Sequence, residues 1–203
     1  MIDKSIPYYN ILMAYRGGCT ESVRLAEGYA LRAYQPGDEA AWARMEHAVG
    51  DFESESAALA YFAQQFLGDK TMLERRMSLA IDPQGAVVGS CFAWRNENAE
   101  KPFSFLHWLV VDPAHQGKGL GRALCVRTLE FFESMGELPV YLHTQPWSYK
   151  AVCLYDSVGF RMLKGKTPFA CENQYQQAMT ALKPLLTQDV FSRLEKSAEE
   201  SMA

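Results

Sequence analysis

The stretch that decides the fold is Ser104–Phe132, SFLHWLVVDPAHQGKGLGRALCVRTLEFF. Its first part is apolar, aromatic or β-branched, which predicts a buried strand in the middle of a sheet. Asp112-Pro113 ends this strand, and the glycine-rich run Gln116–Gly121 follows. Apolar residues then recur at helical spacing up to Gly136, which predicts an amphipathic helix carrying Leu120, Leu124, Phe131 and Met135 on one face.

The glycine-rich run predicts a loop that binds an anion. Three glycines directly before a helix leave backbone N–H groups with no side chains in the way, and the helix dipole adds partial positive charge. A Walker A loop is excluded because Lys118 is followed by Gly119 rather than by Ser or Thr. A dinucleotide fingerprint is excluded because Arg122 stands where its third glycine belongs.

Two motifs carry a resemblance to a known family. Gln-x-x-Gly-x-Gly, after a strand ending in Val-Val-Asp-Pro, resembles the pyrophosphate loop of the GNAT superfamily of N-acetyltransferases, which bind acetyl-CoA. The segment Ser148–Phe160, SYKAVCLYDSVGF, resembles a later GNAT segment, with Ser148 at a position where asparagine is common. The matching residues in that segment are Ala151, Leu154, Tyr155, Gly159 and Phe160.

The resemblance implies an α/β (α+β) GNAT fold: a mixed, mainly antiparallel sheet with splayed central strands and flanking helices. The element order read from the sequence agrees, with a first strand at Tyr29–Tyr34, two helices, three strands, and then helix, strand, helix and strand. We expect an N-terminal extension over residues 1–27 packed on the body, a GNAT domain over 28–170, and a C-terminal helical extension over 171–203.

The resemblance also implies residues that would hold acetyl-CoA as cosubstrate, with no metal. Backbone N–H groups near Leu109, Val110 and Val111 would receive the thioester carbonyl as an oxyanion hole. Ser148 would hydrogen-bond a pantetheine amide. The pyrophosphate would lie on the loop, with a counter-charge beside it; these residues are Gln116, Gly117, Lys118, Gly119, Leu120, Gly121 and Arg122.

Tyr155 and His107 are the candidate catalytic residues. The phenol of Tyr155 keeps its proton at neutral pH and can deliver it to the departing CoA thiolate, although a packing tyrosine is the alternative. His107 is predicted on the strand face shared by Phe105, Leu109 and Val111, where it would accept the amine proton directly or through water, or else be a core residue. Weaker candidates are His143, Glu100 and Glu46, while His115 is expected to be exposed and able to touch phosphate.

Aromatic residues are candidates for an acceptor pocket, although aromatic residues in strands more often belong to the core. The set is Trp94, Trp108, Trp147, Tyr8 and Tyr9.

Bulk properties exclude several classes of protein. The 203 residues carry a formal charge of −4, which argues against a broad nucleic-acid surface, and Arg75-Arg76 is only a basic doublet. No apolar run is long enough to span a bilayer, and the N-terminus does not read as a secretory signal. Five scattered cysteines without Cys-x-x-Cys spacing suggest reduced thiols, no zinc site and a cytoplasmic location.

We therefore expect an N-acetyltransferase that moves the acetyl group of acetyl-CoA to a primary amine of a small molecule or peptide, by direct transfer in a ternary complex. The alternative is a non-catalytic acetyl-CoA-binding sensor or interaction module on the same fold. Family habit and the apolar stripe near the C-terminus suggest a homodimer. The sequence does not name the amine.

Overall fold

The computed structural model describes residues 3, 5–19, 22–97 and 99–200. Their fold is mixed α/β with mainly antiparallel strand pairing, which confirms the predicted fold class. The strands follow the order β2-β3-β4-β5-β6-β1-β7. The chain forms two compact units, the first mainly Thr20–Trp94 with Leu106–Ser134, and the second Asp3–Cys19, Arg95–Phe105 and Met135–Ala203.

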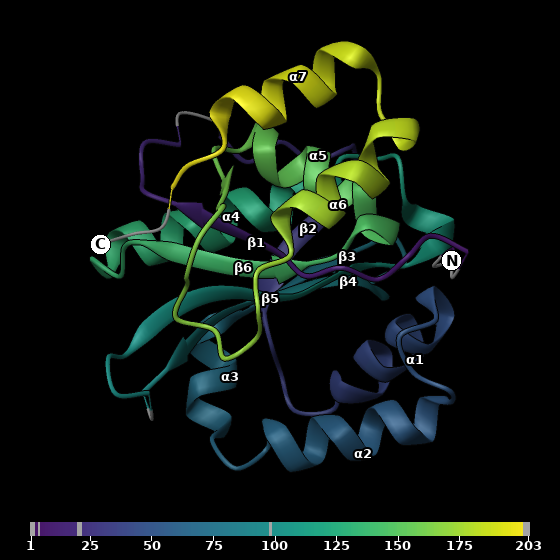
Figure 1. Ribbon diagram of the computed structural model, residues 1–203. Helices are drawn as coiled ribbons and strands as arrows, with labels where there is room; N and C mark the ends of the chain where they lie inside the picture. Colours follow the sequence, from purple (N-terminus) through teal and green to yellow (C-terminus); the bar gives the residue numbers. More distant parts are fainter. Residues whose placement is uncertain (1–2, 4, 20–21, 98, 201–203) are drawn as a thin grey trace. The chain divides into compact units, whose positions relative to one another are not determined.

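The first unit holds the strands β2 (Ala30–Ala33), β3 (Met77–Ile81), most of β4 (Val87–Asn96) and most of β5 (Phe103–Val111). Its helices are α1 (Glu39–Val49), α2 (Glu55–Gln65), α3 (Lys70–Arg76) and α4 (Leu120–Ser134), with a short 3₁₀ turn η1 at Pro113–His115. The antiparallel pairs β2/β3 and β3/β4 form its sheet. Figure 1 shows α1, α2 and α3 gathered on one side of these strands.

Local sequence explains where these helices begin and end. Ser54 and Asp69 cap α2 and α3, because their side-chain oxygens accept the N–H groups of Ala57 and Met72. Gly50 ends α1 in a left-handed conformation with φ of 98°, which glycine adopts without steric cost. The buried faces of these helices then pack on β3, β4 and β5 and form the core: Trp42, Met45, Phe62, Leu73, Met77, Leu79, Phe92 and Val110.

Helix α4 confirms the predicted helix after the glycine loop, but its buried stripe differs from the prediction. Phe132 is fully buried, whereas Met135 lies beyond the helix with 44% of its surface exposed. Phe131 is only partly buried and lies beneath the Arg76 guanidinium. Gly89 on β4 allows the close approach of this helix, since a Cβ there would stand 3.0 Å from Leu124 Cδ1.

The second unit holds β1 (Ile11–Tyr15), the start of β5, β6 (Val140–Thr144) and β7 (Arg161–Met162). Its helices are α5 (Tyr149–Ser157), α6 (Tyr175–Leu182) and α7 (Gln188–Ser197), with 3₁₀ turns η2 (Pro146–Ser148) and η3 (Lys183–Leu185). Figure 1 shows α5, α6 and α7 on one side of β1 and β6. The predicted C-terminal helices are thus present, and η3 contains the proline that interrupts them.

Strand β1 is the main difference from the predicted element order. It pairs antiparallel with β6 on one side and with β7 on the other, and all five of its residues are buried. The stretch around Ile11 was expected only to pack on the body. It instead supplies a strand because both neighbouring strands offer hydrogen-bonding edges and its side chains are apolar on both faces. From β2 onward the predicted order holds, with α3 added.

Strand β5 lies in the middle of the sheet, as predicted, and its neighbours are β4 and β6. It pairs in parallel with β6 at Ser104↔Val140 and Phe105↔Tyr141. The expected splaying of the central strands stays a prediction.

Candidate functional site

The loop between β5 and α4 is held by local hydrogen bonds. The Asp112 side chain accepts the N–H of Ala114 at 3.0 Å, which closes the η1 turn. The Gln116 side-chain amide donates to the Val111 carbonyl at 3.1 Å and so ties the loop back to the end of β5. These bonds fix the chain on the β5 side of the glycines.

The glycines that follow have the geometry of an anion cradle. Gly117 and Gly119 have φ of 79° and 80°, and a Cβ added at either position would meet no atom within 4 Å. The Ala123 N–H donates to the Gly119 carbonyl at 3.0 Å and begins the α4 ladder. The backbone N–H groups of Leu120–Arg122 precede this first helical hydrogen bond, so they lie at the positive end of the helix dipole and are not used within the helix. Open space, positive φ and leading amides fit a pyrophosphate.

Two basic side chains of the loop already have partners in the first unit. Lys118 Nζ donates to the Tyr29 hydroxyl at 2.7 Å, so this exposed ammonium group is held beside the loop. His115 Nε2 lies 3.6 Å from Asp82 Oδ2, and only 23% of its side chain is exposed. The expectation that His115 is exposed is wrong, because its ring packs against Tyr29 and faces two carboxylates, those of Asp82 and Asp112.

Trp108 breaks the regular alternation of β5. Its φ of 48° is left-handed, which is rare for a bulky residue and is typical of a bulge or a strained site. Its ring packs in the same cluster as Val110, and the His107 ring contacts Trp94 and Phe66 of that cluster. Phe105 packs in a different cluster, with Tyr141 and Phe169, so the prediction that His107 shares a face with Phe105 is wrong. Its shared face with Leu109 and Val111 stays a prediction.

Glu46 is the residue whose importance the sequence did not reveal. It lies on α1 with 1% of its surface exposed, so its expected place at a pocket mouth is wrong. Burial and the nearby Asp51 raise the pKa of Glu46 well above its ordinary value. The available signal was helical spacing: Trp42 and Glu46 are four residues apart and share a face of α1.

Three buried polar atoms accompany the aromatic cluster of the first unit. Among the described residues, Glu46 Oε1 and the indole nitrogen of Trp42 have no hydrogen-bond partner, and the indole nitrogen of Trp108 has none of good geometry but interacts with Tyr61. The Trp42 and Trp108 rings are 5.3 Å apart, and both contact Tyr61. Burial raises the pKa of Tyr61, the Trp108 side chain lowers it by a smaller amount, and Glu46 adds a further small increase. An apolar wall with one acceptor and two donors suits a small polar molecule or water.

The predicted residues of the second unit are placed as follows. Tyr155 is buried on α5 at 7% exposure, with its ring 5.8 Å from that of Phe160. Ser148 Oγ accepts a hydrogen bond from the Gln145 side chain at 3.2 Å, so its hydroxyl already has a partner. His143 is exposed, and its Nε2 lies 2.9 Å from Asn10 Oδ1.

The proposed aromatic set is divided between the two units. Trp94 and Trp108 lie in the cluster of the first unit, whereas Tyr8 packs on Trp147 in the second, with ring centroids 5.1 Å apart. Tyr9 is partly buried, and Glu100 is exposed in a bend. The five aromatic residues therefore do not form a single pocket within one unit.

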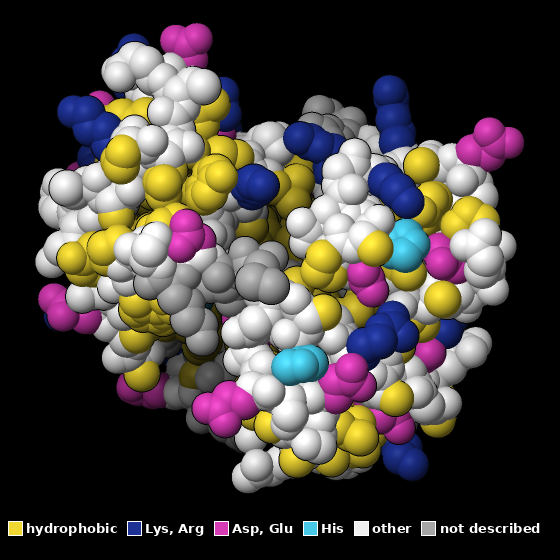
Figure 2. Space-filling view, turned by 90° about the vertical axis from the view of Figure 1, so that its right-hand side faces the viewer, with side chains coloured by type: hydrophobic (Ala, Val, Ile, Leu, Met, Phe, Trp, Pro, Cys, Tyr) yellow, Lys and Arg dark blue, Asp and Glu magenta, His cyan; other side chains and the backbone are white. Residues whose placement is uncertain are grey.

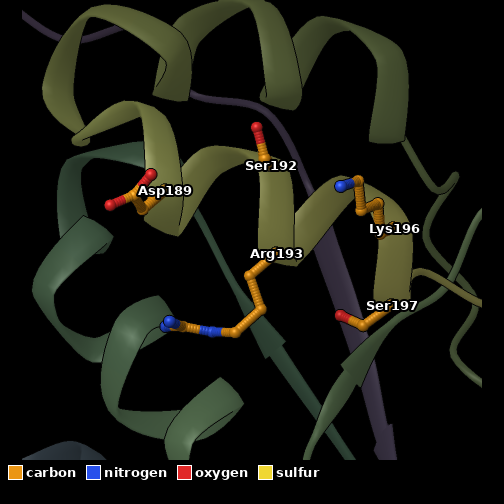
Figure 3. A pocket seen from close by; sticks show the side chains of 5 residues that line it. All are labelled: Asp189, Ser192, Arg193, Lys196 and Ser197. Carbon is orange, nitrogen blue, oxygen red and sulfur yellow. The ribbon is translucent and has the colours of Figure 1, made fainter.

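A separate pocket of about 470 Å³ lies along α7 (Figure 3). All of its lining residues belong to α7: Asp189, Ser192, Arg193, Lys196 and Ser197. The Arg193 side chain also reaches Asp156 on α5, with an N–O distance of 2.6 Å. A surface formed by one helix offers no wall to exclude water, so we assign no chemistry to it.

Some absences concern the described residues only. No described group of three or more His, Cys, Asp or Glu side chains is placed to hold a metal ion. Within the described ranges no helix has the length and apolar character that crossing a bilayer requires. On the face in Figure 2, basic and acidic side chains are interspersed without a continuous basic patch.

Comparison with known proteins identifies the family. The model of the acetyltransferase (GNAT) family matches residues 39–160, which is more than half of the chain. The chain belongs to this family.

The relatives of this GNAT chain are similar to it over part of their length. It is 32% identical over 151 residues to a mycothiol acetyltransferase of Thermobispora bispora, covering 67% of this chain and 48% of the relative. The corresponding protein of Streptomyces coelicolor is 29% identical over 147 residues, with 68% and 44% covered. The chain thus spans about half the length of the curated relatives it matches.

Solved structures agree on the fold. A GCN5-related N-acetyltransferase from Sphaerobacter thermophilus superposes with a TM-score of 0.60 and 25% identity, covering 77% of this chain and 49% of that one. A GNAT-family acetyltransferase from Colwellia psychrerythraea gives a TM-score of 0.57 at 13% identity, with 76% and 53% covered.

Proposed function

We propose that this chain is an acetyl-CoA-dependent N-acetyltransferase acting on a primary amine of a small molecule or peptide. The observation that carries the proposal is the Gln116–Gly121 loop, whose glycines at positive φ leave open space at the N-terminus of α4. Family membership supports the same cosubstrate. Curated relatives are named mycothiol acetyltransferases, but we do not carry their substrate over to a chain of about half their length.

Acetyl-CoA would supply the acetyl group as a thioester. The protein would bind the pyrophosphate, stabilise the oxyanion, accept the amine proton and donate a proton to the leaving thiolate. The loop amides would hold the pyrophosphate, with Arg122 as counter-charge. Amides after the break at Trp108, from Leu109 to Val111, would stabilise the oxyanion that forms on the carbonyl. Interruptions of this kind re-aim backbone groups beside active sites, which is why we retain this assignment.

Two groups would handle protons. We propose that His107 or Glu46 accepts the amine proton, since both lie at the Trp108 cluster and a carboxyl with a raised pKa is a better base near neutrality. Tyr155 would donate a proton to the leaving thiolate. Ser148 would contribute to pantetheine binding only by giving up its bond from Gln145.

The cosubstrate is tested by thermal unfolding with and without acetyl-CoA. At about 100 times the dissociation constant, binding adds roughly 2.7 kcal/mol. For a chain of this size that is a rise in Tm on the order of 5 to 10 °C.

A matched pair at position 119 locates the phosphate. Both Asn and Asp tolerate the left-handed φ better than other residues, so Gly119→Asn and Gly119→Asp share the backbone strain and differ in charge. We expect Gly119→Asp to lose far more of the acetyl-CoA-dependent rise in Tm than Gly119→Asn. Gly50→Asp, at φ of 98° in open space outside the loop, should keep it. Equal responses from the two loop variants would move the phosphate elsewhere, and no rise in the parent protein would remove the cosubstrate.

The catalytic role of Tyr155 is tested with Tyr155→Phe, which keeps the packing against Phe160 and removes the hydroxyl. We expect kcat to fall roughly 10²-fold or more, with the acetyl-CoA-dependent rise in Tm unchanged, as for loss of a general acid. Tyr149→Phe on the same helix is the control. Unchanged turnover in Tyr155→Phe would exclude the role. If the parent protein binds acetyl-CoA but turns over no amine in a broad panel, the non-catalytic sensor is the better account.

A further inference from the structure

Three partly buried aromatic rings meet in the first unit, and each comes from a different segment. Phe52 lies in the bend between α1 and α2, Tyr61 lies on α2 and Trp108 lies on β5. Their ring centroids are 5.3 to 5.7 Å apart in all three pairs. The fully buried Trp42 contacts each of them, at 5.3 to 6.5 Å. We call these four residues the four-ring cluster.

Polar contacts hold the rings of this cluster in place. His47 Nδ1 lies 3.0 Å from the Phe52 carbonyl oxygen, which ties the bend to α1. The Tyr61 side chain interacts with the Trp108 side chain. Side chains that are fixed before a ligand arrives lose little conformational entropy when it binds, so the cluster is suited to a flat apolar group.

The four-ring cluster adjoins the backbone amides to which we assign the thioester carbonyl. Trp108 immediately precedes Leu109, so the Cα atoms of the two residues are about 3.8 Å apart. The cluster, these amides and the glycine loop all belong to the first unit. A molecule whose ring lies on the cluster would therefore hold a short side chain next to the reacting carbonyl.

The carboxyl groups nearest to the cluster give it a negative charge. The buried Glu46 is close enough to affect the pKa of Tyr61, and its carboxyl hydrogen-bonds the Asp51 side chain. Because a hydrogen bond between two carboxyl groups requires one proton, the pair carries one negative charge. An ammonium group is attracted both by this charge and by the faces of aromatic rings.

We propose that the acceptor is an arylalkylamine, a primary amine joined by a short alkyl chain to an aromatic ring, and that Phe52, Tyr61 and Trp108 bind this ring. The inference rests on the proposed acetyl transfer and names the substrate class of that site. As the N–C bond forms and the thioester C–S bond breaks, the bound ammonium loses two protons. One proton leaves to solvent and the other ends on the CoA sulfur.

The first test compares three acceptors with acetyl-CoA saturating: 2-phenylethylamine, 2-cyclohexylethylamine and ethylamine. We expect kcat/KM for 2-phenylethylamine to exceed that for ethylamine roughly 10- to 100-fold, because its ring is removed from water. It should exceed that for 2-cyclohexylethylamine roughly threefold or more, because a saturated ring of similar size cannot stack on aromatic side chains.

The second test measures binding without turnover. CoA replaces acetyl-CoA, so no acetyl group can be transferred, and Tm is followed against the concentration of 2-phenylethylamine or 2-phenylethanol. The two probes share the ring and the chain and differ in charge at neutral pH. We expect a saturable rise in Tm with both and a lower half-saturation for the amine. Equal half-saturation would overturn the assignment to a cationic ligand.

Matched variants locate the ring. Phe52→Leu and Tyr61→Leu keep an apolar side chain and remove the ring, so each should lower kcat/KM for 2-phenylethylamine roughly three- to tenfold and change that for ethylamine little. Tyr61→Phe keeps the ring and should retain the preference. Phe191→Leu changes a partly buried ring on α7, outside the cluster, and is the control. The acetyl-CoA-dependent rise in Tm verifies that each variant is folded.

The outcomes separate this inference from the proposed function. If ethylamine is acetylated as well as 2-phenylethylamine, or if Phe52→Leu behaves like Phe191→Leu, acetyl transfer stands and the aromatic site is overturned. If acetyl-CoA raises Tm but no amine is acetylated, the proposed catalysis fails. Binding of 2-phenylethylamine that depends on Phe52 and Tyr61 would then still support the aromatic site, and the absence of such binding would overturn it.

Discussion

The buried carboxyl of Glu46 lowers the free energy of unfolding at neutral pH. Burial and Asp51 disfavour its charged form, so its pKa is raised in the folded protein above that of the unfolded chain. Near pH 4 the carboxyl is neutral in both states. As pH rises above the unfolded pKa, the unfolded chain releases its proton first, and stability falls until the pH passes the folded pKa.

Glu46→Gln should remove that loss. We expect the variant to be more stable than the parent protein at pH 7 to 8 and to lose this advantage near pH 4, measured by urea unfolding across this range. Glu53→Gln, on an exposed side chain, is the control and should show no such trend. If the stability advantage of Glu46→Gln does not vary with pH, the pKa of Glu46 is the same in the folded and the unfolded protein.

The same variant separates stability from catalysis. If Glu46 accepts the amine proton, Glu46→Gln lowers kcat/KM while raising stability at neutral pH, the trade-off expected at an active site. If His107 is the base, His107→Gln lowers kcat/KM and Glu46→Gln does not.

At the scale of elements, α7 is tied to α5 through one buried carboxylate. The Asp156 side chain is 1% exposed and accepts bonds from Arg193 at 2.6 Å and Arg161 at 3.2 Å. Both arginines are partly exposed, which reduces the value of each contact. The two bonds nevertheless satisfy a carboxylate that could not be buried alone.

Asp156→Ala should therefore cost about 2 kcal/mol of unfolding free energy and release α7 first. The measurement is Tm together with hydrogen exchange of the α7 amides. Asp189→Ala, in the exposed first turn of α7, should cost only a few tenths. Similar losses from both substitutions would show that α7 is held mainly by apolar contacts around Leu194.

The strand-loop-helix unit could be predicted because each of its signals is local. An apolar run, Asp-Pro, three glycines and a periodic helix agree with one another over Ser104–Ser134. The break at Trp108 could not be predicted, since a left-handed φ at a bulky residue is imposed by surrounding structure. The same break lies beside His107, whose ring contacts a different cluster from that of Phe105.

Long-range pairing was the second limit of sequence analysis. Strand β1 reads only as an apolar segment until its partners are known, and those partners lie about 130 residues or more away. Glu46 was likewise visible as a charged residue, but its burial depends on tertiary packing of α1, which brings it close enough to Tyr61 of α2 to affect the pKa of that residue. The roles assigned to Tyr155, Ser148 and the oxyanion amides stay predictions.

At the scale of the whole molecule, the second unit depends on its N-terminal strand. Removing residues 1–9 leaves β1 intact, whereas removing residues 1–16 exposes edges of both β6 and β7. Exposed edges template aggregation. We expect the shorter truncation to yield soluble monodisperse protein and the longer one to aggregate, as judged by soluble yield and size-exclusion chromatography. Equal behaviour would show that β1 is dispensable.

The position of β1 has a consequence for synthesis in the cell. It is made before the other described strands, whereas its partners β6 and β7 are made last of them. At the usual rate of about 5 to 20 residues per second, Ile11–Tyr15 waits roughly 7 to 30 seconds for partners. During that time a fully apolar segment has no strand to pair with, so we expect chaperones to bind the nascent chain at β1 before its later strands are made.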